Sequence, residues 1–216
     1  MKQSRKIKPT RISISGRIPY KGNSIQYEST LERDFLIYFT FLENVIEIVP
    51  QPVTIKFEKN NRTYPYTPDF YIEFDKSTNK KPLIVEVKPK ELWQENWREW
   101  SVKWKAMLSY CKEHGYQFRI FDETRIHHLA FQNIVFLSKY FRISYKESEV
   151  ELVLETVSSF SNPTIGNVID VLSSKIEKDH LKRLLYFMMY TKKIGFDLFE
   201  PIDEKLVVCL NPKEFN

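Results

Sequence analysis

Apolar residues in the first half of the chain recur at two spacings, which predict helices and strands. Leu31, Phe35, Tyr38, Phe39 and Leu42 follow Ser29 at helical spacing. Shorter apolar runs bounded by polar turns are typical of strands, and a longer periodic run that ends at a glycine is typical of a helix. We expect strands at 51–57, 63–74, 82–88 and 116–121, a turn at 58–61 and a helix at 91–114. The predicted order is helix, three strands, helix, strand.

The pattern changes in the last third of the chain. A short helix is expected at 133–140, and a second domain is expected to begin near residue 146. Its helices are predicted at 148–158, 164–174 and 179–191, and a hairpin is predicted across 194–210. Helices followed by a hairpin are typical of a winged helix. We therefore expect an α/β domain over residues 1–144 and a winged-helix-like domain over residues 145–216.

Composition narrows the class of protein. The chain has 216 residues, of which 42% are hydrophobic and 28% charged, as in an ordinary globular protein. It has no run of 18 apolar residues, so we expect no transmembrane helix, and its first residues lack the apolar stretch of a secretory signal. Cys111 and Cys209 lie far apart and in no metal-binding spacing, which favours a reduced, cytoplasmic setting.

Charge is distributed unevenly around a net value of +5. Residues 145–216 carry nine Lys/Arg and twelve Asp/Glu, so residues 1–144 carry a net charge of +8. The first 21 residues contain no acid and seven bases: Lys2, Arg5, Lys6, Lys8, Arg11, Arg17 and Lys21. Such an arm could neutralise nucleic-acid phosphates or could be a soluble tail, and charge alone does not separate the two interpretations.

An unusual set of charges accompanies the predicted strand 82–88. Residues two apart in a strand share a face, so Glu86 and Lys88 point the same way. Asp69 follows Pro68 in the middle of the preceding predicted strand, and a hairpin through the polar segment 75–81 would bring Asp69 beside Glu86. Adjacent carboxylates repel each other unless a cation joins them, and hard oxygen ligands suit Mg²⁺.

Lys88 on the same face could orient a water molecule or stabilise charge on a phosphate. The alternative is that Glu86 and Lys88 form the solvated face of an edge strand while Asp69 caps a turn. The apolar character of the rest of that strand favours burial, and hence the metal site.

Glu32 has two interpretations. Ser29 and Glu32 have the spacing of a capping box, in which the glutamate accepts a hydrogen bond from the Ser29 backbone N–H. Glu32 also adjoins Leu31 on the buried side of the predicted helix, where it could supply a third carboxylate to Asp69 and Glu86. Taken without other motifs, the capping box is the better interpretation.

Four motifs together resemble one family. YESTLERDFL at 27–36, QP at 51–52, YTPDF at 66–70 and VEVKPK at 85–90 resemble the TnsA endonucleases of Tn7-like transposons, which belong to the PD-(D/E)xK nuclease superfamily. The resemblance covers about residues 12–137, and the predicted element order matches the restriction-endonuclease-like core of that superfamily. Combined motifs are much more specific than a short D-x(n)-E-x-K pattern alone.

The resemblance implies a catalytic site and a cofactor. By motif, the catalytic residues are Glu32, Asp69, Glu86 and Lys88, whereas Lys90 fits the family pattern less well. The implied cofactor is Mg²⁺, for which Mn²⁺ is expected to substitute. Asp69, Glu86 and the backbone carbonyl of Val87 are its expected ligands, with Glu32 completing or tuning the site.

The same resemblance implies a function and partners. A TnsA-like protein is a Mg²⁺-dependent endonuclease that cuts double-stranded DNA at transposon ends, on the strand that its partner does not process. The partners implied are a DDE transposase (TnsB-like) and an AAA+ regulator (TnsC-like), in a bacterial cytoplasm and on DNA. Two alternatives remain open, namely a stand-alone restriction or repair nuclease of the same superfamily and a non-catalytic DNA-binding adaptor.

Two further groups of residues have alternative roles. The four tryptophans of the chain, Trp93, Trp97, Trp100 and Trp104, have helical spacing. Their expected role is the core face of the helix 91–114, and the alternative is a platform for stacking bases. On the flank of that helix, Arg98, Lys103 and Lys105 could meet phosphates or solvate the surface. His127 and His128 have no metal-ligand partner at a suitable spacing, so we expect them on the surface.

Overall fold

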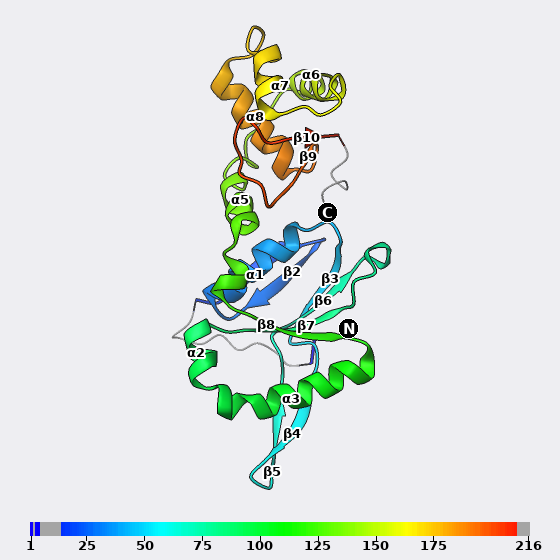
Figure 1. Cartoon of the computed structure of the whole chain (residues 1–216), viewed down its shortest axis with the longest axis vertical. Helices are drawn as coiled ribbons and strands as arrows, with labels where there is room; N and C mark the ends of the chain where they lie inside the picture. The colour runs from blue at the N-terminus through cyan, green and yellow to red at the C-terminus, as the bar shows by residue number, and fades with distance from the viewer. Residues whose placement is uncertain (2, 5–13, 211–216) are drawn as a thin grey trace. The chain divides into compact units, whose positions relative to one another are not determined.

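A computed structural model of the chain describes residues 1, 3, 4 and 14–210. The chain divides into two compact units, residues 1–127 and residues 128–216 (Figure 1). Of the seven bases in the predicted N-terminal arm, Lys2, Arg5, Lys6, Lys8 and Arg11 lie outside the described residues. Within the described part of the chain, no helix has both the length and the apolar character needed to cross a membrane.

A four-stranded mixed sheet organises the first unit (Figure 1). Its strands, in spatial order, are β3 (Val45–Pro50), β6 (Phe70–Phe74), β7 (Leu83–Val87) and β8 (Gln117–Phe121). The pairs β3–β6 and β6–β7 are antiparallel, and β8 is parallel to β7. A parallel pair requires a crossover connection, which is made here by α2 (Lys90–Glu95) and α3 (Trp97–His114).

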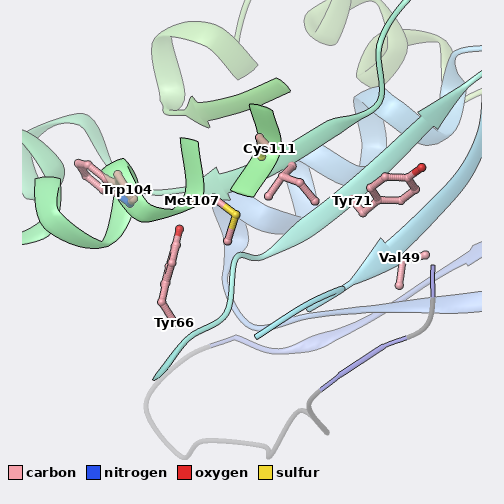
Figure 2. Close-up of a cluster of buried hydrophobic side chains, with 7 residues drawn as sticks. Val49, Tyr66, Tyr71, Trp104, Met107 and Cys111 are labelled. Carbon is pink, nitrogen blue, oxygen red and sulfur yellow. The ribbon is translucent and has the colours of Figure 1, made fainter. Parts of the chain in front are cut away.

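Helices cover both faces of this sheet. On one face, Phe35 of α1 (Thr30–Phe41) stacks against Phe70 at 5.3 Å between ring centroids and meets Phe121 at 5.1 Å. On the other face, Met107 of α3 belongs to a buried cluster that Figure 2 shows and that also includes Ile84 of β7. The full cluster is Val49, Tyr66, Tyr71, Ile84, Trp104, Met107 and Cys111. Successive side chains of β6 and β7 point to opposite faces of the sheet, so these two strands contribute residues to a core on each face.

Two hairpins flank the sheet. The first pairs β1 (Gly16–Tyr20) with β2 (Asn23–Tyr27), and the second pairs β4 (Ile55–Lys59) with β5 (Arg62–Tyr66). The β4 strand contacts α3, so the second hairpin projects on the α3 side of the sheet (Figure 1). The short elements of this unit are η1 (Lys76–Thr78) and α4 (Glu123–Ile126).

The sheet differs from the sequence prediction at its start. Its first strand, β3, precedes the predicted strand 51–57, and the single strand predicted at 63–74 is two strands, β5 and β6. Asp69 consequently lies just before β6 rather than in the middle of a strand. Pro68 explains the break, because proline cannot donate a ladder hydrogen bond. The helix predicted at 91–114 is likewise divided at Asn96, between α2 and α3.

The second unit is mainly helical. Its elements are α5 (Leu129–Leu137), α6 (Glu147–Ser158), α7 (Ile165–Leu172), α8 (Lys178–Tyr190), β9 (Gly195–Phe196) and β10 (Val208–Cys209). The strands β9 and β10 are antiparallel, and Thr164 forms an isolated bridge with Val207. Because α5 contacts α8, the two units divide at 127/128, earlier than the domain boundary expected at 144/145.

Candidate functional site

The pairing of β6 with β7 places Asp69 beside Glu86. Phe70 lies opposite Val85, so the residue before Phe70 is level with the residue after Val85. The Asp69 backbone N–H donates to the Val85 carbonyl at 2.9 Å, and the Val87 N–H donates to Asp69 Oδ2 at 2.7 Å. The hairpin expected through 75–81 therefore makes the juxtaposition that the sequence predicted.

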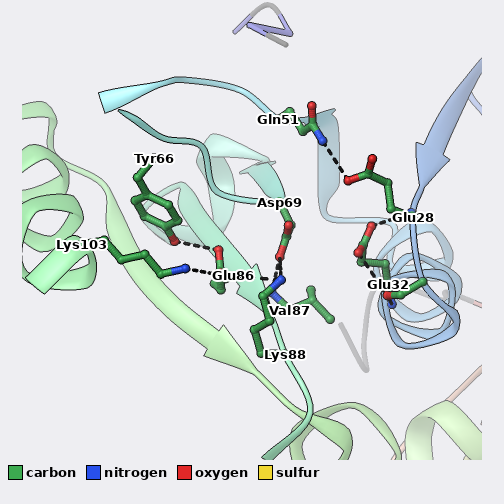
Figure 3. Close-up of polar contacts among 10 residues, drawn as sticks. Glu28, Glu32, Gln51, Tyr66, Asp69, Glu86, Val87, Lys88 and Lys103 are labelled. Atoms are coloured by element: carbon green, nitrogen blue, oxygen red, sulfur yellow. Dashed lines mark hydrogen bonds and ion pairs between the residues drawn. The ribbon is translucent and has the colours of Figure 1, made fainter. Parts of the chain in front are cut away.

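Lys88 lies between the two carboxylates (Figure 3). Its Nζ is 3.7 Å from Asp69 Oδ2 and 3.7 Å from Glu86 Oε1. Its backbone N–H donates to the Phe121 carbonyl of β8 at 3.0 Å, which fixes the chain where β7 ends. Three of the four predicted catalytic residues are thus brought together, and one ammonium group joins two acids.

Glu86 is held by two further residues that sequence analysis did not assign to the site. Its side chain is 2% exposed, and its Oε2 accepts a hydrogen bond from the Tyr66 hydroxyl at 2.7 Å. The Lys103 Nζ, from α3, lies 3.3 Å from Glu86 Oε1. Tyr66 begins the YTPDF motif, which could have marked it, whereas Lys103 carried no signal beyond its place on the flank of the helix.

Burial and mutual repulsion perturb the acids. Burial raises the pKa of Asp69 well above its usual range, the negative charge of Glu86 raises it further, and Lys88 opposes both effects. Burial alone would lower the pKa of Lys88, but the carboxylates of Asp69, Glu86 and Glu32 outweigh it, so that pKa is raised. The lysine therefore stays charged while it neutralises the acids around it.

Glu32 caps the start of α1 from a buried position. Its side chain oxygens accept hydrogen bonds from the Glu28 backbone N–H at 2.8 Å and the Ser29 hydroxyl at 3.1 Å. The Ser29 hydroxyl in turn accepts from the Glu32 backbone N–H. This arrangement resembles the capping box predicted from sequence. The difference is that the Glu32 carboxylate accepts its backbone hydrogen bond from the N–H of Glu28 and not from that of Ser29. With only 8% of Glu32 exposed, burial raises the pKa of its carboxyl, while its two hydrogen bonds and the Lys88 charge oppose that rise.

Gln51, from the QP motif, supports Asp69 from the end of β3. Its backbone has φ of 46°, a left-handed conformation that costs a residue with a side chain about 1 kcal/mol. The conformation directs the Gln51 N–H to the Asp69 carbonyl at 2.8 Å. The Gln51 Nε2 donates to Glu28 Oε2 at 3.2 Å, so this motif links the start of α1 to the strand that carries Asp69 (Figure 3).

The donor atoms suit a hard divalent cation, although the described residues form no cluster of three His, Cys, Asp or Glu side chains arranged around a metal. Asp69 and Glu86 direct oxygens at a common cation, the Lys88 ammonium, and proximity to Glu86 contributes to the raised pKa of Asp69. The Val87 peptide borders them, because its N–H is bonded to Asp69. This oxygen-rich donor pair fits the Mg²⁺ expected from sequence.

A cleft of 570 Å³ opens onto these residues. Asp69, Glu86 and Lys88 line it, together with Phe57 and Tyr64 from the β4–β5 hairpin. Lys103 also lines the cleft. An extended substrate could therefore reach the carboxylates from solvent while it lies against the hairpin.

The remaining sequence candidates lie elsewhere. Trp104 is buried in the core cluster, as expected, but Trp97 is 50% exposed. His127 is exposed and its Nε2 lies 3.0 Å from Asp34 Oδ2. The His128 side chain accepts a hydrogen bond from the Phe131 N–H at the start of α5, and burial lowers its pKa. Both histidines therefore have local structural partners.

Comparison with known proteins identifies the region that carries the site. Residues 42–123 match the family described as TnsA-like endonuclease N terminal. No curated protein matches the chain. The matched segment contains Asp69, Glu86, Lys88 and Lys103, whereas Glu32 precedes it. Residues 42–123 are therefore similar to the TnsA-like endonuclease N-terminal domain, and this similarity implies a nuclease role with DNA as substrate.

Proposed function

We propose that the protein is a metal-dependent endodeoxyribonuclease whose active site comprises Asp69, Glu86 and Lys88, with Glu32 at its edge. One observation carries the proposal, namely that a single lysine lies 3.7 Å from the buried carboxylate of Glu86 and 3.7 Å from the half-buried carboxylate of Asp69, in a segment that matches a nuclease family. A structural ion pair would need only one acid. Two acids that share a lysine suit a site that exchanges positive charge during its reaction.

Each residue has a distinct role in this proposal. Asp69 and Glu86 hold Mg²⁺, with the Val87 carbonyl as a further oxygen, and the bound ion supplies Lewis acidity and a more acidic water molecule. Asp69 is oriented by the Val87 N–H, and Glu86 by the Tyr66 hydroxyl. Lys88, relieved of neutralising both acids, orients the attacking water or stabilises the phosphate in the transition state.

The arrangement of elements supports a restriction-endonuclease-like PD-(D/E)xK core. A helix, an antiparallel group of three strands, a crossover helix and a parallel fourth strand follow one another along the chain in the expected order, with the β4–β5 hairpin inserted after the first strand. For the second unit we infer a winged-helix-like domain. Its support is the succession of α6, α7 and α8 before the β9–β10 pair, together with the bridge from Thr164 to Val207.

The biological reaction that we propose is cleavage of DNA at transposon ends during cut-and-paste transposition. The protein would be the nuclease subunit of a heteromeric Tn7-like transposase, beside a DDE transposase and an AAA+ regulator. The family of residues 42–123 supports this assignment. Co-expression of the chain with such partners, with excision of a marked transposon as the readout, tests the assignment.

The nuclease activity itself is tested with purified protein and duplex DNA. We expect strand cleavage in Mg²⁺ or Mn²⁺ and none in EDTA, alone or with the partners present. Cleavage by the isolated protein of DNA that lacks transposon ends would favour a stand-alone nuclease. DNA binding without cleavage under every metal and partner condition would favour the non-catalytic adaptor and contradict the proposal.

Replacement of Glu32 by glutamine separates its two roles. The amide oxygen can still accept hydrogen bonds from the Glu28 N–H or the Ser29 hydroxyl, so the free energy of unfolding should change by less than about 1 kcal/mol, the energy of a cap. The lost negative charge should nevertheless remove most cleavage activity. Denaturant unfolding and a cleavage assay measure the two effects, and full activity in Glu32→Gln would leave Glu32 with a structural role only.

The two units are expected to differ in DNA affinity. Residues 1–127 contain 22 Lys/Arg and 16 Asp/Glu, whereas residues 128–216 contain 11 and 12. The first unit should bind duplex DNA with an affinity that falls steeply as salt increases, and the second should not bind at physiological salt. Gel-shift titrations of the two fragments and the whole chain measure this difference.

We propose that the second unit instead contacts a protein of the transposition machinery. Tight, salt-sensitive DNA binding by residues 128–216, with none by residues 1–127, would reverse the assignment. The whole chain serves as the control, because its affinity should be similar to that of the first unit.

A further inference from the structure

Lys103 extends from α3 into the catalytic cleft. Its side chain is 18% exposed, and its Nζ lies 3.3 Å from Glu86 Oε1, closer than the 3.7 Å of Lys88. The ammonium also lies over three aromatic rings, at 4.7 Å from the centroid of Tyr66, 4.9 Å from that of Trp100 and 5.6 Å from that of Trp104. A surface lysine that only solvates its helix would have no such enclosure.

The contacts of Glu86 leave it little capacity for another partner. Oε2 accepts the Tyr66 hydrogen bond, and Oε1 is shared between Lys103 and Lys88. A divalent cation that binds Oε1 must displace one of these two ammonium groups. Lys103 is suited to leave, because its long side chain is flexible and the aromatic faces stabilise an ammonium group in other positions.

The net charge of the cleft also suits a lysine that moves from Glu86 to the substrate. Three acids line the cleft, Glu28, Asp69 and Glu86, against two ammonium groups, Lys88 and Lys103, so its net charge is −1 when all five are ionised and would be +1 with a divalent cation bound. That positive surplus matches a DNA phosphodiester, which is negative before reaction and gains negative charge in the transition state.

We propose that Lys103 is a second catalytic lysine. In the metal-free protein it neutralises Glu86, and in the reacting complex it moves to a non-bridging oxygen of the DNA phosphate in the same cleft. The inference rests on the proposed nuclease function and assigns to it a residue outside the YTPDF and VEVK motifs. Lys103 thus serves first as a placeholder for the cation and then as a substrate ligand.

Lys103→Met tests the placeholder role without DNA. Methionine retains an unbranched apolar chain against the aromatic rings and removes the charge. Binding of Mn²⁺ to the whole protein, measured by calorimetry, should tighten about tenfold, since Glu86 no longer has a competing cation 3.3 Å away. Lys105→Met, on the exposed side of the same helix, is the matched control and should leave Mn²⁺ affinity unchanged.

The same variant tests the substrate role. At saturating Mn²⁺, Lys103→Met should cleave duplex DNA about a hundredfold more slowly than wild type, the scale of losing one charge-stabilising donor. Lys103→Arg keeps the charge, so it should keep Mn²⁺ affinity near the wild-type value and recover part of the cleavage rate. Tighter metal binding together with slower cleavage is not expected from a residue that only packs.

The outcomes separate this inference from the proposed function. Unchanged or weaker Mn²⁺ binding by Lys103→Met, or Lys103→Arg that behaves like Lys103→Met, would overturn the inference, whatever the cleavage result. If Lys103→Met does not fold, Lys103→Gln, which also removes the charge, decides by the same Mn²⁺ measurement. Failure of the proposed function itself would appear differently, as wild-type protein that neither binds Mn²⁺ nor cleaves DNA.

Discussion

Asp69→Asn is expected to reduce DNA cleavage by about a thousandfold or more, because a metal ligand contributes several kcal/mol to transition-state stabilisation. Folding should survive, since the asparagine oxygen can still accept the hydrogen bond from the Val87 N–H. The variant also removes a buried negative charge beside Glu86, so the metal-free protein should be as stable as wild type or more so. Cleavage and thermal unfolding, both in defined Mg²⁺, measure the two effects.

Stability as a function of pH gives this prediction a second readout. The pKa of Asp69 is raised by burial and by Glu86, so the folded state binds more protons than the unfolded state above the ordinary carboxyl pKa of about 4. The contribution of Asp69 to stability is therefore present at low pH and lost as pH rises through its raised pKa. In Asp69→Asn, which has no carboxyl at this position, that decrease of stability with rising pH should disappear. Undiminished cleavage in Mg²⁺ by this variant would contradict the metal-ligand role of Asp69.

The sequence could predict the local chemistry around Asp69 and Glu86. A strand period of two residues and a polar turn were enough to place Asp69, Glu86 and Lys88 together, because an antiparallel hairpin leaves little freedom once its register is set. The capping role of Glu32 could also be predicted from sequence, since it depends on neighbours three or four residues away. The catalytic roles of all four residues remain predictions.

The features of the fold that could not be predicted from sequence depend on contacts between segments far apart in the chain. Strand β3 was missed because the residues after Leu42 show no strong alternation, and it is its pairing with β6 that defines it. The β4–β5 hairpin was read as part of the central sheet, since a strand sequence does not specify its partner. Pro68 is the local residue that marks where β5 and β6 separate.

Lys103 illustrates the same limit at the level of the site. It lies 17 residues beyond Glu86, and no motif joins the two. Its importance arises from the packing of α3 on the sheet, which carries Trp104 into the core and turns the neighbouring ammonium toward Glu86. Periodicity could place Lys103 on the flank of the helix, but only the packing of α3 on the sheet determines which acid it meets.

Lys88→Met should have the other large effect. Lys88 lies 3.7 Å from both Asp69 and Glu86, so its loss leaves two buried acids with Lys103 as the cation nearest to Glu86. We expect the metal-free protein to lose about 2–3 kcal/mol of unfolding free energy, below the usual cost of breaking a buried pair because Asp69 can take up a proton. Cleavage should fall by about a hundredfold or more, as for the loss of one charge-stabilising donor.

The response to metal distinguishes this role from simple packing. A divalent cation can replace the missing ammonium between the carboxylates, so Mg²⁺ should raise the melting temperature of Lys88→Met more than that of wild type. Stability should therefore be regained in Mg²⁺ while cleavage is not, since the lysine also acts on water or phosphate. Lys90→Met is the matched control, two residues away and exposed, and should change neither quantity. Equal metal responses in Lys88→Met and wild type would show that Lys88 does not occupy the place of the cation.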